Sequence, residues 1–259
     1  MTFRTRFAPS PTGPLHLGHA YSALLAHDRA RAEGGKFFLR LDDIDQSRAR
    51  AHWARLIEED LTWLGVTWDG PIWSQHARSD KYTQALQRLW DMGLLYPCTC
   101  TRADIKAAAN APQEGAPLIG PDGLIYPGTC HARVSGEMKA NSALRLNMRE
   151  AIQHIEDNYI SFSEEKNTHT LSLAKMINEI GDVVLARKDM AASYHLSIVV
   201  DDAEQGITHV IRGEDLHEAT FIHVLLQRLL NYPGLSYVHH KLVRDETGKR
   251  LAKRDDARA

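Results

Sequence analysis

The sequence of 259 residues contains only three cysteines, and two of them, Cys98 and Cys100, are separated by one residue. Three cysteines cannot form a disulfide framework, so we expect metal binding or catalysis rather than bridging. No stretch approaches the ~18 consecutive apolar residues of a membrane span, and the N-terminus lacks the apolar segment of a signal peptide. These absences predict a soluble, cytoplasmic protein.

Net charge is also nearly absent, because 31 Lys and Arg oppose 33 Asp and Glu and leave a formal charge of −2. Proteins that coat nucleic acid by bulk attraction are usually strongly basic, so this class is disfavoured. Residues 241–259 differ from the rest, since they hold seven Lys or Arg against four Asp or Glu. That end either contacts a polyanion or forms a solvated tail.

What is present is typical of a folded protein. Hydrophobic residues make up 43% of the chain, charged residues 25% and aromatic residues 7%, which excludes a disordered chain, a collagen-like repeat and a coiled-coil rod. The length allows a single large α/β unit or a core domain with a sizeable insertion.

The opening segment predicts a strand, a loop, a helix and a second strand. Residues 3–8 alternate apolar and basic side chains as a half-buried strand does, and the proline-rich run after them predicts a turn. A helix is expected over 19–33, ending at two glycines, and the second strand over 36–41. Such a unit builds a parallel sheet, and its first loop lies at the carboxyl edge where ligands bind.

Two amphipathic helices should follow, one capped by Ser47 and ending at Gly65 and the other over 80–91, with apolar faces that we interpret as packing surfaces. Residues 96–137 carry all three cysteines and many prolines and glycines, which indicates an inserted module. Beyond it we expect the sheet to resume and a helix over 217–230. The strand-like or apolar runs that would resume the sheet are 143–148, 182–187, 194–200 and 207–212.

The loop between the first strand and the first helix carries the clearest chemistry. Backbone N–H groups at a helix N-terminus attract phosphate, and Gly13 and Gly18 allow close approach. The glycine spacing mimics a P-loop, but His19 and Ala20 replace its Lys and Ser/Thr, which disfavours a P-loop NTPase. His16 and His19 could instead ligate a metal, although no third ligand lies nearby in sequence. We favour imidazole N–H donors that stabilise charge developing on a phosphoryl group.

Several segments, in order along the chain, resemble the class I aminoacyl-tRNA synthetases in their glutamate-specific form. Residues 6–19 read RFAPSPTGPLHLGH and contain the HIGH signature, and residues 250–254 (RLAKR) resemble the KMSKS loop. Between them lie LDDID at 41–45, VVDD at 199–202 and ITHVIRGEDL at 207–216. The resemblance covers nearly the whole chain. It implies an α/β fold with a Rossmann-like parallel sheet, and it implies that the protein activates L-glutamate with ATP.

The resemblance also implies roles for single positions. The glutamate pocket would be formed by Arg6, Ala8, Ser10, Asp42, Tyr194 and Arg212, and the catalytic and ATP-binding groups would be His16, Gly18, His19 and Lys253. Arginines would bind the substrate carboxylates through their forked donors, whereas outside matched motifs they would be interpreted as surface ion pairs. Mg²⁺ is expected with ATP, and the sequence does not identify its ligands.

Two of the matching segments depart from the family pattern. Asp42 stands where the family usually has Glu, which shortens the reach to the substrate ammonium by one methylene group. In the KMSKS-like loop, Arg250 and Ala252 replace Lys and Ser, so only Lys253 keeps the position expected to contact the ATP phosphates. Activation should survive, because a mobile lysine charge is the essential group and a serine supplies at most a hydrogen bond.

The insertion favours one branch of this family. Cys98, Cys100, Tyr126 and Cys130 resemble the zinc site of the glutamyl-Q tRNA(Asp) synthetases, with His131 as the alternative fourth ligand and three unrelated buried thiols as the other interpretation. This resemblance implies a structural Zn²⁺ that orders a loop-rich module. It also implies activation of glutamate without tRNA and transfer to queuosine in the anticodon of tRNA(Asp).

Two other functions remain open at this point: the catalytic fragment of a glutamyl-tRNA synthetase that charges tRNA(Glu), and a zinc-containing RNA-binding module without catalysis. Glutamyl-tRNA synthetases carry a long anticodon-binding region after the KMSKS loop, and here five residues follow Arg254. We expect residues 1–94 to form the first half of the catalytic domain. Residues 95–180 would form the zinc-bearing insertion and connecting region, and 181–259 the second half with the KMSKS-like loop.

Overall fold

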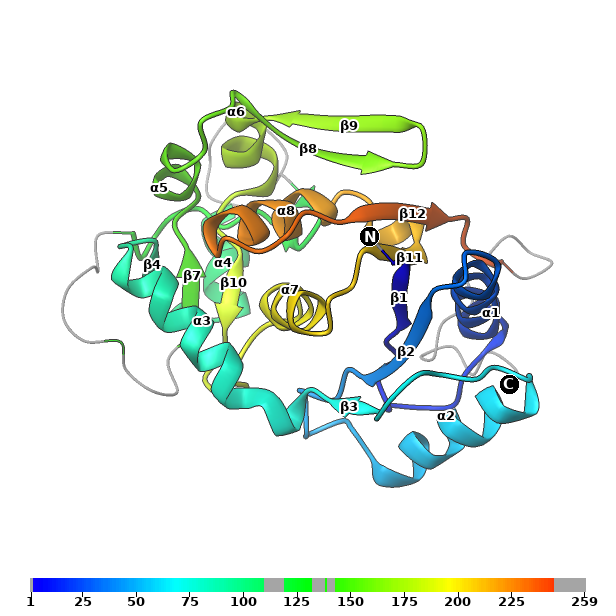
Figure 1. Ribbon diagram of the computed structural model, residues 1–259. Coiled ribbons are helices and arrows are strands. Elements are labelled where there is room, and N and C mark those ends of the chain that lie inside the picture. The colour runs from blue at the N-terminus through cyan, green and yellow to red at the C-terminus, as the bar shows by residue number, and fades with distance from the viewer. Residues whose placement is uncertain (1, 110–118, 132–137, 139–142, 245–259) are drawn as a thin grey trace.

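The computed structural model describes residues 2–109, 119–131, 138 and 143–244, and its central strands run between two layers of helices (Figure 1). The strands follow the order β3, β2, β1, β11, β12, β8 and β9, and all the paired neighbours are parallel except β8 and β9. β1 and β11 are linked where the backbone N–H of Thr208 donates to the carbonyl of Arg4, at 2.9 Å. The strands are β1 (Arg4–Phe7), β2 (Lys36–Leu41), β3 (Trp73–Ser74), β8 (Tyr159–Glu164), β9 (Asn167–Ser172), β11 (His209–Gly213) and β12 (Ser236–His240).

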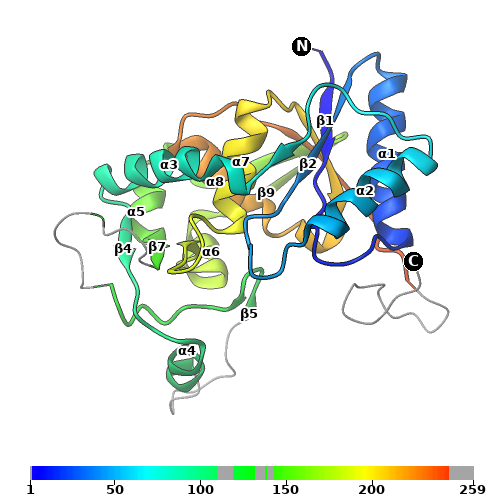
Figure 2. The ribbon, with the colours of Figure 1, turned by 90° about the horizontal axis from the view of Figure 1, so that it is seen from below.

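The two helical layers follow from the alternation of side chains along β2. Phe37 and Leu39 pack into the core beneath α1 and α2, whereas Phe38 packs against the core of the other layer. Figure 2 shows α1 and α2 on one side of β1 and β2, with α3, α7 and α8 on the other. These helices are α1 (Leu17–Ala32), α2 (Ala51–Trp63), α3 (Ser79–Asp91), α7 (Tyr194–Glu204) and α8 (Thr220–Leu229).

The middle of the chain forms smaller elements outside the main sheet. β4 (Leu95–Pro97), β7 (Leu144–Leu146) and β10 (Val184–Ala186) form an antiparallel sheet. Figure 2 shows α4 (Arg102–Ala109) standing away from the main sheet. The other short elements are the strands β5 (Ile119–Gly120) and β6 (Gly123–Leu124), the helices α5 (Met148–Gln153) and α6 (Leu173–Lys175), the 3-10 turns His76–Arg78 and Glu214–Leu216, and the π-helical turn Met176–Ile180.

Several predicted elements are confirmed and others are wrong. The opening strand–helix–strand unit, the helix now labelled α3 and the helix α8 are present, and β2 has the predicted bounds. The apolar run 194–200 is wrong as part of a sheet, because it forms α7, which is buried on nearly all sides and therefore shows no helical stripe. The runs 143–148 and 182–187 contribute strands to the antiparallel sheet rather than to the parallel one.

Two further features differ from expectation. Ser47 does not cap α2, because the helix begins at Ala51 and the Ser47 hydroxyl instead donates to Asp45. The hairpin of β8 and β9 was not predicted. β8 does alternate, with Ile160 and Phe162 buried, but the run is short, and the polar β9 has no apolar alternation. Among the helices that the structure describes, none combines the length and the apolar character needed to cross a bilayer.

Candidate active site

A cavity of about 630 Å³ opens at the carboxyl edge of β1, β2 and β11, where the loop before α1 meets the start of α7. Its lining includes every predicted substrate residue that the structure describes: Arg6, Ala8, Ser10, His16, Gly18, His19, Asp42, Tyr194 and Arg212. Lys253, with Arg250 and Ala252, lies outside the described residues. Residues that are up to about two hundred positions apart thus form one site, as the crossover topology of a parallel sheet requires.

The two histidines of the loop form a capping box at the start of α1. Nδ1 of His16 accepts the backbone N–H of Gly18 at 3.1 Å, and Nδ1 of His19 accepts the backbone N–H of His16 at 3.2 Å. Because each Nδ1 is an acceptor, each neutral ring carries its proton on Nε2. A Cβ atom at Gly18 would lie 3.0 Å from the His16 ring, so glycine permits this close packing. The geometry provides two imidazole donors beside a helix N-terminus, a setting that suits phosphate.

Arg212 is a buried cation held by neutral groups. Its side chain comes from β11, the residue is 6% exposed, and within the described part of the chain it has no carboxylate partner. Its guanidinium donates to the hydroxyl of Thr220 at 2.6 Å, to Nδ1 of His223 at 3.2 Å and to Nε2 of His239 at 3.3 Å. The positive charge of Arg212 is therefore fixed in place but not neutralised.

The histidines around Arg212 are kept neutral by their surroundings. Burial, reinforced by the charge of Arg212, holds the pKa of His223 well below its ordinary value, and the same two causes lower the pKa of His239 to about 4. Neutral rings can accept hydrogen bonds from the guanidinium, so each presents its unprotonated nitrogen to Arg212. A protonated ring at either position would place two cations together in the interior.

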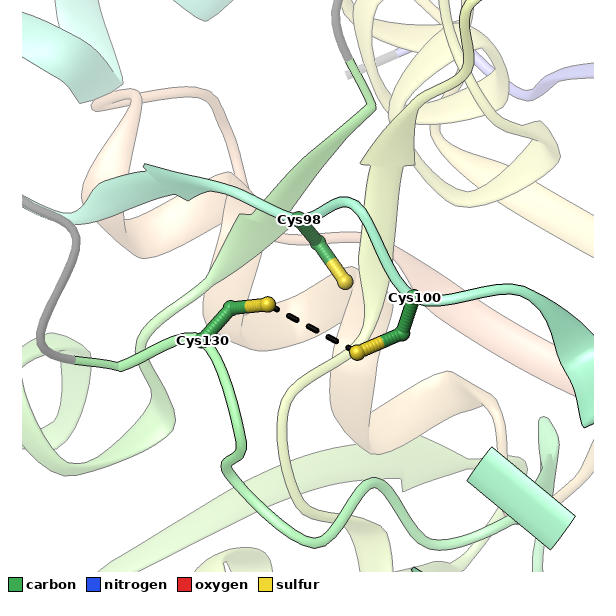
Figure 3. Close-up of side chains that lie close together, drawn as sticks. All are labelled: Cys98, Cys100 and Cys130. Atoms are coloured by element: carbon green, nitrogen blue, oxygen red, sulfur yellow. Dashed lines mark hydrogen bonds between the residues drawn. The ribbon is translucent and has the colours of Figure 1, made fainter. Parts of the chain in front are cut away.

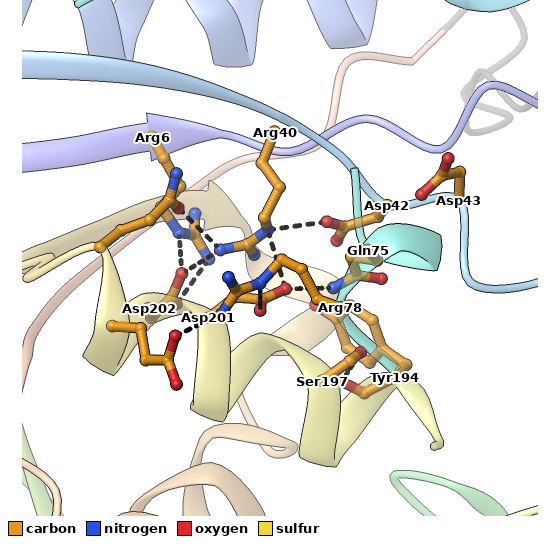
Figure 4. Close-up of polar contacts among 12 residues, drawn as sticks. Arg6, Arg40, Asp42, Asp43, Gln75, Arg78, Tyr194, Ser197, Asp201 and Asp202 are labelled. Atoms are coloured by element: carbon orange, nitrogen blue, oxygen red, sulfur yellow. Dashed lines mark hydrogen bonds and ion pairs between the residues drawn. The ribbon is translucent and has the colours of Figure 1, made fainter. Parts of the chain in front are cut away.

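Arg6 and Arg40, by contrast, are paired with carboxylates (Figure 4). Arg6 forms a bidentate pair with Asp202 of α7 at 2.9 and 3.2 Å, and Arg40 of β2 donates to the same carboxylate at 2.7 Å. Arg40 is completely buried and also donates to Asp42 at 2.9 Å. This network ties β1 and β2 to α7 across the sheet and fixes one wall of the cavity. Arg6 lines the cavity although two of its nitrogens are held by Asp202.

Asp42 follows the last residue of β2, where its backbone N–H donates to the carbonyl of Pro9 at 3.0 Å. Burial raises the pKa of Asp42 to about 6, although the nearby charge of Arg40 opposes the shift. At neutral pH the carboxylate is therefore mostly ionised but easily protonated. A ligand ammonium at this position would favour the ionised form.

Asp201, the neighbour of Asp202, anchors the same end of α7 from the other side. Its carboxylate is completely buried and accepts hydrogen bonds from Tyr82 at 2.9 Å, Gln75 at 3.1 Å and Arg78 at 2.7 Å. The role of these partners, and of Arg40, was not predicted from sequence. The one available signal was a pair of adjacent acidic residues inside a buried apolar run.

The three cysteines converge in a second cluster, formed by the segment after β4 and the loop after β6 (Figure 3). The Sγ atoms of Cys100 and Cys130 lie 3.6 Å apart, and the Tyr126 hydroxyl lies 3.5 Å from Sγ of Cys98 and 3.3 Å from Sγ of Cys100. A tetrahedral zinc with Zn–S bonds of ~2.3 Å and a Zn–O bond of ~2.0 Å places sulfurs about 3.8 Å apart and the oxygen about 3.5 Å from each sulfur. The donor set therefore fits a zinc ion.

Hydrogen bonds around the cluster indicate which of Tyr126 and His131 is better placed to be the fourth ligand. The backbone N–H of Cys130 donates to the Tyr126 oxygen at 3.0 Å, and the Arg145 guanidinium lies over the Tyr126 ring while donating to Cys98 at 3.3 Å. These donors stabilise a phenolate and a thiolate. The ring of His131, in contrast, is paired through Nε2 with Asp182. The geometry favours Tyr126.

A parallel sheet with a histidine-capped loop and a buried arginine at its carboxyl edge is consistent with a class I synthetase catalytic domain. The chain matches the family model described as "tRNA synthetases class I (E and Q), catalytic domain" over residues 2–259, and it belongs to that family.

Individual members of the family show which of its proteins the chain resembles. The chain is 56% identical over 262 residues to the glutamyl-Q tRNA(Asp) synthetase of Rhodobacter capsulatus, covering 98% of this chain and 92% of that protein. It is 41% identical over 257 residues to the protein of the same name from Burkholderia cenocepacia, covering 99% and 82%. Among solved structures, the glutamate-tRNA synthetase of Elizabethkingia anophelis superposes with a TM-score of 0.78 at 28% identity. That match covers 98% of this chain and 53% of the synthetase, so the chain spans about half its length.

Proposed function

We propose that this chain activates L-glutamate with ATP to form glutamyl-adenylate and pyrophosphate, and then transfers the glutamate to queuosine in the anticodon of tRNA(Asp), acting in the cytoplasm where tRNA is found. The observation that carries the first step is Arg212, a buried guanidinium that no described carboxylate neutralises, at the wall of the cavity. The identity to the two glutamyl-Q tRNA(Asp) synthetases supports the second step.

Each side of the cavity has its own task in the activation step. Arg212 and the neighbouring Arg6 bind the carboxylates of the glutamate substrate, and the Asp42 carboxylate binds the ammonium group of the same substrate. Ala8, Ser10 and Tyr194 complete the amino-acid pocket. One carboxylate oxygen of glutamate attacks the α-phosphorus of ATP, and pyrophosphate leaves. Catalysis is then mainly the positioning of the two substrates and stabilisation of the charge at phosphorus.

The ATP side of the cavity is formed by the loop before α1. The Nε2–H groups of His16 and His19 donate to the phosphates, and Gly18 lets them approach the helix N-terminus. Lys253, which lies outside the described residues, would supply the mobile positive charge, and Mg²⁺ would accompany the triphosphate. These assignments follow the family motif and agree with the tautomers that the capping box imposes.

We also propose that Cys98, Cys100, Cys130 and Tyr126 hold a structural Zn²⁺ in the segment between the two halves of the catalytic domain. All four positions of a tetrahedral ion would be filled by the protein, so the ion would order the loops and take no part in the reaction. On this division the halves are residues 1–94 and 181–259, with 95–180 as the zinc-bearing insertion and connecting region.

The proposal is tested by two assays that separate it from charging of tRNA(Glu). We expect glutamate-dependent ATP–pyrophosphate exchange in the absence of any tRNA, which a non-catalytic RNA-binding module could not support. We also expect labelled glutamate to be transferred to queuosine-containing tRNA(Asp) whose terminal adenosine has been removed, and not to the same tRNA lacking queuosine. Charging of tRNA(Glu) at its terminal adenosine, without transfer to tRNA(Asp), would contradict the proposal.

A further inference from the structure

A second group of metal-binding side chains lies away from the cysteine cluster, beside the hairpin of β8 and β9. Glu164 ends β8, His169 lies on β9, and His217 precedes α8. Their candidate donor atoms all lie within 4.8 Å of one another. Nε2 of His169 is 2.9 Å from Oε2 of Glu164, and Nε2 of His217 is 3.6 Å from the same oxygen. Three donors of the kind that transition metals prefer thus converge on one point.

The hydrogen bonds within the group leave one carboxylate oxygen directed at the two imidazoles. Oε1 of Glu164 accepts both the backbone N–H of His239 at 2.6 Å and the ring Nδ1–H of His239 at 2.8 Å. Oε2 faces His169 and His217. Nε2 of His169 is buried and, despite its short distance to Oε2, makes no hydrogen bond within the described residues. A buried ring nitrogen that lies close to a carboxylate oxygen, yet forms no hydrogen bond with it, is a polar atom whose bonding a metal ion would complete.

The two rings are also held in place by packing. Phe162 stacks on His169, its cross-strand partner, with ring centroids 5.1 Å apart and planes 23° from parallel. The same phenylalanine meets the edge of His217 at 5.3 Å, and the two histidine rings are 4.6 Å apart. This packing restricts the rings to orientations in which both nitrogens stay close to the carboxylate. Preorganised ligands of this kind reduce the entropy lost when an ion binds.

The surroundings favour a cation that keeps access to solvent. Glu164 and His217 line a cavity of about 650 Å³, and its other lining residues include the acidic side chains Glu165, Glu214, Asp215 and Glu218. Such a concentration of carboxylates attracts divalent ions from solution. The cavity also leaves room for water in the positions that the protein does not fill.

We propose that Glu164, His169 and His217 bind a divalent transition-metal ion, with Zn²⁺ as the ion that fits best. In a tetrahedral site with bonds of ~2.0–2.1 Å, neighbouring donor atoms lie about 3.3 Å apart, and the observed spacings of 2.9 and 3.6 Å bracket that distance. Two nitrogen donors disfavour Mg²⁺ and Ca²⁺, which prefer oxygen. His239 holds the carboxylate from behind, as the partners of metal ligands commonly do.

This site is independent of the cysteine cluster, so calorimetric titration can count the two separately. The whole chain, first loaded with one equivalent of Zn²⁺, should take up a second equivalent. His169→Gln and His217→Gln should each weaken that second event by at least about tenfold, because even removing a group behind a ligand commonly costs about 10–100-fold in affinity. A Cys98→Ser variant should lose the thiolate-dependent event and keep the histidine-dependent one.

Two matched controls test the assignment. His154→Gln removes an exposed histidine elsewhere, and Glu218→Gln removes one charge from the acidic rim; neither should change the second event by more than about twofold. Thermal unfolding of each variant shows whether its fold is kept. If one of the two ligand variants fails to fold, the other still tests the proposal. Uptake of a single Zn²⁺ by the wild-type chain, or equal second-site affinity in the wild type, His169→Gln and His217→Gln, would overturn the proposal.

Discussion

Replacing Arg212 with methionine should separate substrate recognition from stability. A buried charge usually contributes to stability only when a partner neutralises it, and Arg212 has only neutral acceptors among the described residues. Methionine fills much of the same volume with an unbranched apolar chain. We therefore expect the unfolding temperature of Arg212→Met to equal or exceed that of the wild type.

The same change should strongly weaken the use of glutamate. A hydrogen bond to a charged group contributes about 1.5–3 kcal/mol, which corresponds to a loss of about 10- to 150-fold at 1.4 kcal/mol per tenfold. Steady-state ATP–pyrophosphate exchange should show this loss in kcat/KM for glutamate, with the KM for ATP unchanged within about twofold. Arg212→Lys keeps the positive charge but not the forked donors of the guanidinium, so its kcat/KM for glutamate should lie between the values of the wild type and Arg212→Met.

Arg228→Met provides the control, because Arg228 lies on α8 and pairs with Asp157 at the surface, at 3.1 Å. Exposed ion pairs are worth about 0–1 kcal/mol, so this variant should keep both its stability and its glutamate kinetics. The reasoning is refuted if Arg212→Met unfolds at a much lower temperature, or if its KM for ATP rises as much as its kcat/KM for glutamate falls.

Three further outcomes are expected. Tyr126→Phe should weaken zinc binding by at least about tenfold in competition with a chelator, whereas His131→Asn should not; equal affinities in all three proteins would exclude the phenolate as a ligand. Because burial raises the pKa of Asp42 to about 6 and the substrate ammonium needs the ionised carboxylate, kcat/KM for glutamate should fall as the pH is lowered through 6, and Asp42→Asn should abolish this acidic limb. Gly18→Ala places a Cβ atom 3.0 Å from the His16 ring, so the KM for ATP should rise; unchanged ATP kinetics would contradict the assigned role of the capping box.

The parts of the fold that the sequence predicts are those with a local cause. β2 is bounded by glycines and by a change in apolar pattern, and its limits are correct. α7 carries a run of apolar residues that is equally typical of a buried strand, and only its packing between the sheet and the neighbouring helices decides for a helix. The same limit applies to β9, whose polar sequence gives no strand signal and which is held in the sheet by its antiparallel pairing with β8, itself paired with β12.

The candidate site also contains residues that the sequence predicts and contacts that it does not. The predicted site residues between Arg6 and His19 lie in one short segment, so a motif can predict them together, and the structure places them around one cavity. The partners of Arg6 and Arg40 cannot be predicted by this route, because Asp202 lies 196 and 162 positions away in sequence. Only the folded sheet shows that the motif arginines differ, with Arg6 paired and Arg212 unpaired by any described carboxylate.

That difference explains how Arg6, Arg40 and Arg212 can lie together at one edge of the sheet and leave a single charge that no described carboxylate compensates, that of Arg212, for the proposed binding of an anion. Arg6 and Arg40 share Asp202, and Arg40 also contacts Asp42, so their charges are largely balanced before any ligand arrives. Arg212 lies on the adjacent strand β11, where Thr220, His223 and His239 hold its guanidinium without neutralising it. The cost of burying that charge is borne during folding, so a carboxylate that reaches Arg212 meets a rigid and already desolvated donor. Binding strength and selectivity for an anionic amino acid then have the same physical origin.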